Sequence, residues 1–266
     1  MSLADLTLDH WRSLDRAAAG RVAHEAAAQA GGRVVLLDTV DHLGGPLHRV
    51  RIERGGREFA LIPGGRVRLG FDPDAWAPTS AQAADYEESR AEGYGYELPL
   101  KEYLAEVLSP VRTAALATVL MAVEDETLTE PPEAMPDALA ARGLRMPGAD
   151  EWEHACGAGA GTLFRWGNEC PLDEPSYGGD GGLRHEPNAF GLHIAYDSYA
   201  TELSGDPAAV HGGDGGEAVC GGYGDLLAWL PLATANRNPS TAEFAYGPGG
   251  EGLYEGFSTR PVFSLR

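Results

Sequence analysis

Cysteine and histidine are the residues of this sequence that could carry redox or metal chemistry. The three cysteines are Cys156, Cys170 and Cys220, and four of the eight histidines lie in the C-terminal half, at positions 154, 185, 193 and 211. Thiolates bind soft ions such as cuprous copper, and imidazoles bind iron, copper and zinc. Cys170 and Cys220 could approach each other in the fold, but their spacing does not require it. We interpret Cys156 as a buried, inert thiol.

Carboxylates and aromatic rings alternate in an irregular segment between residues 72 and 97. The carboxylates are Asp72, Asp74, Asp85, Glu87, Glu88, Glu92 and Glu97, and the rings are Trp76, Tyr86, Tyr94 and Tyr96. Two interpretations are open. The pattern is typical of a solvated loop with one or two helical turns. It could also line a pocket for a cationic ligand, because aromatic faces attract cations.

The overall charge limits the partners of the protein. The 266 residues include 20 Lys and Arg against 40 Asp and Glu, a formal net charge of −20. Such a surface repels phosphate groups, so we expect no nucleic acid and no membrane as partners. No apolar run approaches the roughly 20 residues that span a bilayer, and the N-terminal segment does not resemble a secretory signal. The small, odd number of cysteines favours a reduced, cytoplasmic protein.

The first element that must position these groups is an alanine-rich helix, predicted over 13–30. Two glycines, at 31 and 32, are placed to end it. Its apolar stripe is weak, so we expect the helix to pack on the rest of the chain. The stripe consists of Leu14, Ala18, Val22 and Ala26.

Strands and short helices are predicted to follow this helix. The alternation of apolar residues predicts strands over 33–37, 47–53, 58–62 and 66–71, with a hairpin turn at 55–56. Helices are predicted over 113–123, which we interpret as buried, 136–142 and 148–156. Glycine dominates from 157 to 256, and such a stretch is ordered only if strands, buried aromatics or bound cations hold it in place.

Several segments match the motifs of one family in their order and spacing. They are FALIPGGRVRLGFD at 59–72, SPVRTAAL at 109–116, LRMPGADEWEHACGAGAGTLFRWG at 144–167, PNAFGLH at 187–193 and the terminal GFSTRPVFSLR. The third resembles L-P-T-E-A-E-W-E-x-A-x-R-G-G…F-x-W-G, and the fourth resembles P-N-x-F-G-L-Y-D. Together they resemble the formylglycine-generating enzyme family, also called sulfatase-modifying factors.

This resemblance implies an α+β, C-type-lectin-like fold that is rich in irregular structure, with Trp152 and Trp166 buried. It divides the chain into residues 1–56, an N-terminal helix and strands that pack on the main domain, and residues 57–266, the main domain. Members of the family include copper oxidases, ergothioneine sulfoxide synthases with an iron-binding helical bundle, and binding modules. Fold alone does not choose among these activities.

The residues of the oxidase branch are missing here. That branch carries a C-x4-C pair after R-G-G-S, and the matching segment, 219–240, has no cysteine after Cys220. The resemblance therefore implies no copper site and no formylglycine-generating activity. The H-x3-H-x-E spacing of the iron-binding bundle is also absent. His185 and His193, which bracket the P-N-x-F-G-L motif, are the remaining histidine candidates for a metal centre.

Calcium is the one metal that the carboxylates of the C-terminal half suggest. The family has a calcium site near G-N-V-W-E-W, and the matching segment 194–206 keeps only the end of that motif. Gly-Gly-Asp-Gly-Gly also occurs twice, at 178–182 and 212–216. The candidate calcium ligands are Asp180, Asp197, Glu202 and Asp214. The alternative is a pair of flexible surface loops, and the lack of D-x-D-x-D-G spacing favours that alternative.

The family's groove implies a ligand site where 185–206 meets 220–240. The predicted ligand-binding residues, which mix aromatic faces with polar groups, are His193, Tyr196, Asp197, Tyr223, Trp229, Asn236 and Arg237. Arg237 could pair with a ligand carboxylate, or else form a surface ion pair while Trp229 belongs to the core. We expect a binding module for a small molecule or peptide. The alternative is a metal-dependent oxidative enzyme that acts on a thiol or amine.

Overall fold

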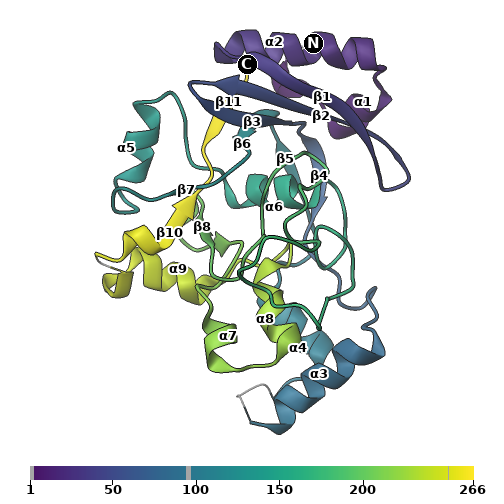
Figure 1. Cartoon of the computed structure of the whole chain (residues 1–266), viewed down its shortest axis with the longest axis vertical. Helices are drawn as coiled ribbons and strands as arrows, with labels where there is room; N and C mark the ends of the chain where they lie inside the picture. Colours follow the sequence, from purple (N-terminus) through teal and green to yellow (C-terminus); the bar gives the residue numbers. More distant parts are fainter. Residues whose placement is uncertain (1–2, 94–96, 251) are drawn as a thin grey trace.

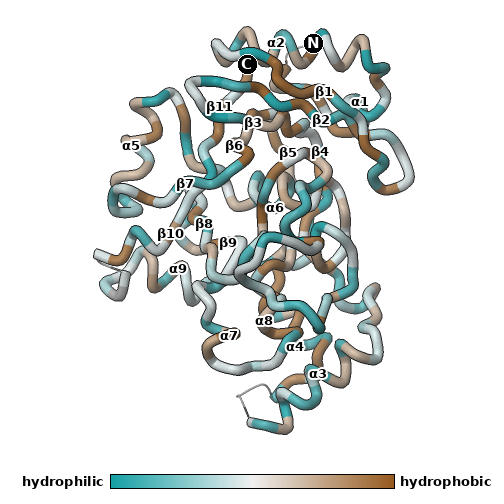
Figure 2. Tube along the Cα trace, in the orientation of Figure 1, coloured by the Kyte–Doolittle hydropathy of each residue, from teal (hydrophilic) through white to brown (hydrophobic). Residues whose placement is uncertain are grey.

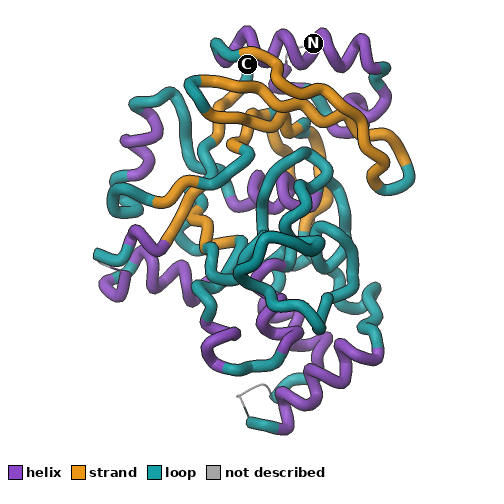
Figure 3. Tube along the Cα trace, viewed as in Figure 1, coloured by secondary structure: helices purple, strands orange, loops and turns teal. Residues whose placement is uncertain are grey.

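The computed structural model of the chain describes residues 3–93, 97–250 and 252–266. It confirms a mixed α+β architecture, in which the strands of the described residues form three sheets (Figure 1 and Figure 3). The largest sheet lies at one end of the molecule, beside both chain termini. Short helices and long loops make up the opposite end, where the acidic segment around α3 is found.

The largest sheet has five antiparallel strands in the order β1-β2-β3-β6-β11. Their bounds are Arg33–His42, Gly45–Arg54, Arg57–Ile62, Val119–Ala122 and Val262–Ser264. The predicted strands and the turn at 55–56 are confirmed, and both turn glycines have the positive φ that a tight hairpin needs. The expected boundary between residues 56 and 57 therefore falls inside the hairpin that joins β2 to β3.

Two helices cover the outer face of this sheet, α1 (Leu8–Ser13) and α2 (Arg16–Ala30). The predicted helix is confirmed, with an aspartate cap at its start and Gly31 in the left-handed conformation at its end. The predicted stripe was offset, because Leu14, Ala18 and Val22 are only half-buried. The fully covered face is instead a row of alanines: Ala19, Ala23, Ala26, Ala27 and Ala30. Small side chains let the helix pack closely on the sheet.

The helix predicted over 113–123 is wrong. These residues form β5 (Arg112–Leu116), which pairs with β4 (Gly65–Leu69), and β6, which lies between β3 and β11. All four residues of β6 are buried, which explains their uninterrupted apolar run. Alanine and leucine have the highest helix propensities, but propensity is worth less than about 1 kcal/mol per residue, and pairing with neighbouring strands outweighs it.

The acidic segment at 72–97 is more regular than a loop. It contains a three-turn helix, α3 (Ser80–Ala91), which begins at a capping box between Thr79 and Gln82. Trp76 and Tyr86 are buried, so they do not line an open pocket. The predicted pocket residues Tyr94 and Tyr96 lie outside the described residues. A further helix, α4 (Leu100–Val107), follows and was not predicted.

The C-terminal half has sparse regular structure, as predicted. A small sheet has the order β7-β10-β8-β9, with bounds Glu126–Thr127, Phe257–Thr259, Thr201–Leu203 and Val210–His211. The remaining α-helices are α5 (Met135–Ala140), α6 (Ala149–Gly157), α7 (Glu217–Gly221), α8 (Asp225–Trp229) and α9 (Pro239–Tyr246). Predicted helices 136–142 and 148–156 are thus confirmed as α5 and α6. Turns and loops fill the interval from 158 to 200.

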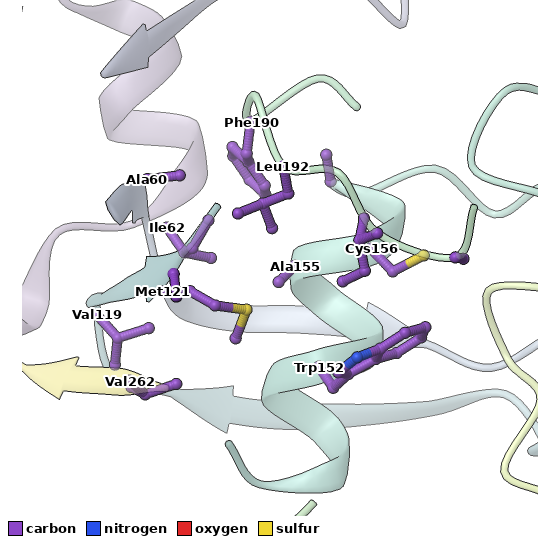
Figure 4. Packing of buried hydrophobic residues seen from close by; sticks show 14 of the residues in the cluster. Ala60, Ile62, Val119, Met121, Trp152, Ala155, Cys156, Phe190, Leu192 and Val262 are labelled. Carbon is purple, nitrogen blue, oxygen red and sulfur yellow. The ribbon is translucent and has the colours of Figure 1, made fainter. Parts of the chain in front are cut away.

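The core lies between α6, the large sheet and the loop that carries Phe190. Trp152 is completely buried, as predicted, and lies with Phe190 and Met121 in this layer (Figure 4). Trp166 is only partly buried and stacks on Phe164 at 4.9 Å between ring centroids. Hydrophobic segments accordingly run along the inner strands, while the loops are largely hydrophilic (Figure 2). Among the described residues, no helix is long and apolar enough to cross a membrane.

Candidate functional site

A buried ion pair links the small sheet to the core. Arg260 donates from Nε and Nη2 to the two carboxylate oxygens of Glu202, at 3.0 and 2.6 Å, and both side chains are buried. The indole Nε1 of Trp152 donates to the same carboxylate at 2.8 Å. Three backbone carbonyls, from residues 122, 123 and 193, accept the remaining guanidinium bonds. Glu202 is therefore held by a cation of the chain itself.

The predicted ligand residues fall into two groups, and the first lies on the loop at 193–197. His193 approaches Glu124 at 2.7 Å, and the hydroxyl of Tyr196 donates to Asp125 at 3.4 Å. Asp197 accepts backbone bonds from residues 178 and 199, so it orders turns of its own loop. Burial and the neighbouring Asp125 carboxylate raise the pKa of Tyr196. Of this group, His193 and Tyr196 thus contact the segment at 124–125.

The second group lies on and after α8. Trp229 is buried in the core and donates from Nε1 to the carbonyl of Glu174 at 3.1 Å. Arg237 donates from Nη2 to Asp150 at 2.5 Å and to Glu153 at 3.0 Å. Its guanidinium therefore already has two carboxylate partners, which a ligand carboxylate would have to displace. The alternative expectation, an ion pair for Arg237 with Trp229 in the core, agrees with these contacts, except that the ion pair belongs to a part-buried cluster and does not lie on the surface.

Tyr223 and Asn236, the other members of the second group, line a cavity of about 260 Å³. We call it the acidic cavity, because the described residues of its wall include three carboxylates and no Lys, Arg or His. The residues that define it are Tyr103, Glu106, Asp214, Glu217, Tyr223 and Asn236. They come from α4, from the start of α7, from the turn before α8 and from the segment before α9, which gather in the same region of Figure 1.

Local backbone geometry forms this cavity. Asp214 accepts the N–H groups of residues 216, 217 and 218 and so caps the start of α7. Burial raises the pKa of the Asp214 carboxyl, although these three donors act in the opposite direction. Gly224 has a φ of +102°, and a Cβ there would collide with Ser89 of α3. That close approach brings α8 against α3, and Asp85 caps α8 from the other helix.

Tyr103 and Glu106 are site residues that sequence reasoning missed, because α4 was not predicted. A signal was present: Leu100, Leu104 and Val107 follow helical spacing, and the first two are buried. Glu106 and Tyr103 flank this apolar stripe. An amphipathic helix was thus recognisable, whereas its place at one cavity with residues of α7 and α9 depends on contacts far apart in the sequence.

The carboxylates proposed as calcium ligands have separate roles. Asp180 is exposed on its loop, Asp197 and Asp214 order turns, and Glu202 binds Arg260. Within the described residues, no three His, Cys, Asp or Glu side chains come close enough together to hold a metal ion. This arrangement does not fit a calcium site built from these four carboxylates.

The three cysteines differ in access, which gives a direct prediction. Cys156 is buried, and burial raises its pKa to about 12, as burial also raises the pKa of Cys170. Cys220 is exposed, with its sulfur 3.1 Å from the Tyr199 hydroxyl.

We expect N-ethylmaleimide to label the folded protein at Cys220 first. Only thiolates react rapidly, and Cys220 is the cysteine that the reagent can reach. Intact mass and peptide mapping measure this, and Cys220→Ser should abolish the early adduct. Early labelling of Cys156 would contradict the prediction.

Comparison with known proteins does not assign a family. No protein-family model matches the chain, and no curated protein matches its sequence.

Proposed function

We propose that the protein is a binding module for a small organic cation, held in the acidic cavity. The observation that carries the proposal is the wall itself: Glu106, Asp214 and Glu217 supply negative charge, and Tyr103 and Tyr223 supply aromatic faces. An ammonium or guanidinium group is attracted by both. A volume near 260 Å³ suits a ligand no larger than an amino acid or a short amine.

The family we propose is that of the formylglycine-generating enzymes, with their C-type-lectin-like fold but without their copper chemistry. Support comes from the order of the matching segments and from Trp152, Glu202 and Arg260. These three residues come from separate matching segments and share one buried network. The missing cysteine after Cys220 supports a binding role over copper-dependent oxidation of a thiol.

The test is calorimetric titration with butylamine at low salt, with glutamate as the anionic comparison. We expect butylamine to bind and glutamate not to bind. Glu106→Gln should weaken butylamine binding about tenfold, since it removes one charge-assisted contact. The matched control is Glu102→Gln, on the same helix but exposed and outside the cavity wall, which should leave the affinity unchanged. Added salt should weaken binding by screening.

Two results would contradict the proposal. One is the absence of butylamine binding, and the other is an equal affinity in the wild type and in Glu106→Gln.

Metal analysis of the purified protein tests the alternative of an oxidative enzyme. Stoichiometric copper or iron would favour that alternative over a binding module.

A further inference from the structure

A second cavity adjoins the acidic cavity on the other side of Tyr223. It has a volume of about 540 Å³ and lies between the loop at 172–177 and the α7–α8 region. Ala218 and Tyr223 line both cavities, so the two share a wall. Tyr177 and the largely buried Trp229 also line the second cavity. Ligand groups in the two cavities would thus both lie against Ala218 and Tyr223.

The second cavity is acidic as well. Asp173, Glu174 and Asp225 line it, and none of its lining residues that the structure describes is Lys, Arg or His. Within the part of the chain that the structure describes, none of the six carboxylates of the two cavities takes part in an ion pair. The chain has only 20 Lys and Arg for 40 Asp and Glu, so many of its carboxylates lack a cationic partner, and these six are among them. Concave walls of one charge sign concentrate the potential and attract counter-ions of the opposite sign.

We propose that the two cavities together bind one linear diamine or polyamine, with an ammonium group in each cavity. The methylene chain between the two charges would pass Tyr223 and Ala218, whose apolar surfaces suit it, while the carboxylates on each side accept from the ammonium groups. This inference rests on the proposed function, because it assigns a second charge to the cation that the acidic cavity binds. A monoamine uses one cavity, whereas a diamine of the right length uses both.

The experiment compares butylamine with ethylenediamine, putrescine, cadaverine and hexamethylenediamine by calorimetry. We expect at least one diamine to bind about tenfold or more tightly than butylamine, with an optimum chain length, because the second contact becomes intramolecular. Asp225→Asn, in the second cavity, should weaken that diamine about tenfold and leave butylamine unchanged. Glu106→Gln should weaken both ligands. Glu169→Gln, exposed and outside both walls, is the matched control.

The outcomes separate this inference from the proposed function. If butylamine binds, but no diamine binds more tightly and Asp225→Asn changes nothing, the inference is overturned and the single-site function stands. If neither butylamine nor any diamine binds, both are overturned. A diamine whose affinity falls in Asp225→Asn while that of butylamine does not would support the two-cavity site.

Discussion

Replacing Arg260 by methionine is expected to lower the free energy of unfolding by about 3–5 kcal/mol, the usual result of breaking a buried ion pair from one side. The variant Arg260→Met leaves the Glu202 carboxylate buried without its cation. It also removes the guanidinium that donates to three backbone carbonyls. These hydrogen bonds connect the end of β6 and the loop at 193–197 to the small sheet. Denaturant unfolding followed by circular dichroism measures the change.

Two controls make this prediction specific. The double variant Glu202→Gln/Arg260→Met should recover part of the loss, since no uncompensated charge stays in the core. Arg33→Met removes an exposed ion pair with Glu53 from the same sheet as β6, and it should change the free energy of unfolding by less than about 1 kcal/mol. If Arg260→Met costs no more than Arg33→Met, the buried network does not stabilise the fold as we argue.

Acidification is expected to destabilise the protein through His211. This imidazole is completely buried, stacks on Trp152 at 4.6 Å and makes an Nδ1 contact with the carbonyl of Asn236 at 3.0 Å. Burial, together with the charge of Arg237, lowers its pKa from 6.5 to about 3. The folded state thus holds a neutral ring that the unfolded state protonates. Stability is intact above pH 6.5 and is lost as the pH falls toward 3.

The size of this effect follows from linkage. Between about pH 7 and about pH 4.5, His211 should remove about 2–3 kcal/mol of the free energy of unfolding. Burial lowers the pKa of His154 as well, so that residue adds to the pH dependence in the same direction. The measured quantity is therefore the difference between wild type and His211→Gln or His211→Phe, from denaturant unfolding across this range. Equal pH dependence in all three proteins would show that His211 does not titrate with unfolding.

Elements with strong local signals were predictable from the residues alone. The hairpin between β2 and β3 follows from paired glycines that adopt positive φ at low cost, and α2 from an alanine run between an aspartate and a glycine. The helix α6 carries acidic residues in its first turn, where the helix dipole favours negative charge. In each case the information lies within a few residues of the element, so no distant partner is needed to decide it.

Local sequence patterns as strong as those of α2 and α6 gave wrong predictions where distant segments of the chain decide the structure. Residues 113–123 contain helix-forming alanines and leucines, yet they become β5 and β6 because two separate sheets offer them partners. The offset face of α2 has the same origin: which alanines are buried depends on the sheet beneath them. A strand gains its hydrogen bonds from another segment, so its formation cannot be evaluated from its own sequence.

The candidate site, too, was predictable from the sequence in part and was otherwise decided by contacts between distant segments. The resemblance to the family placed the ligand site after residue 190, and residue types then singled out candidates there, of which Tyr223 and Asn236 line the acidic cavity. Tertiary structure decided the rest. It engages Arg237 with Asp150 and Glu153, directs His193 to Glu124, and brings Glu106 of α4 to Asp214 across more than a hundred residues of chain. Charge and side-chain type are properties of a residue, whereas whether a charge is neutralised depends on the neighbours that folding provides.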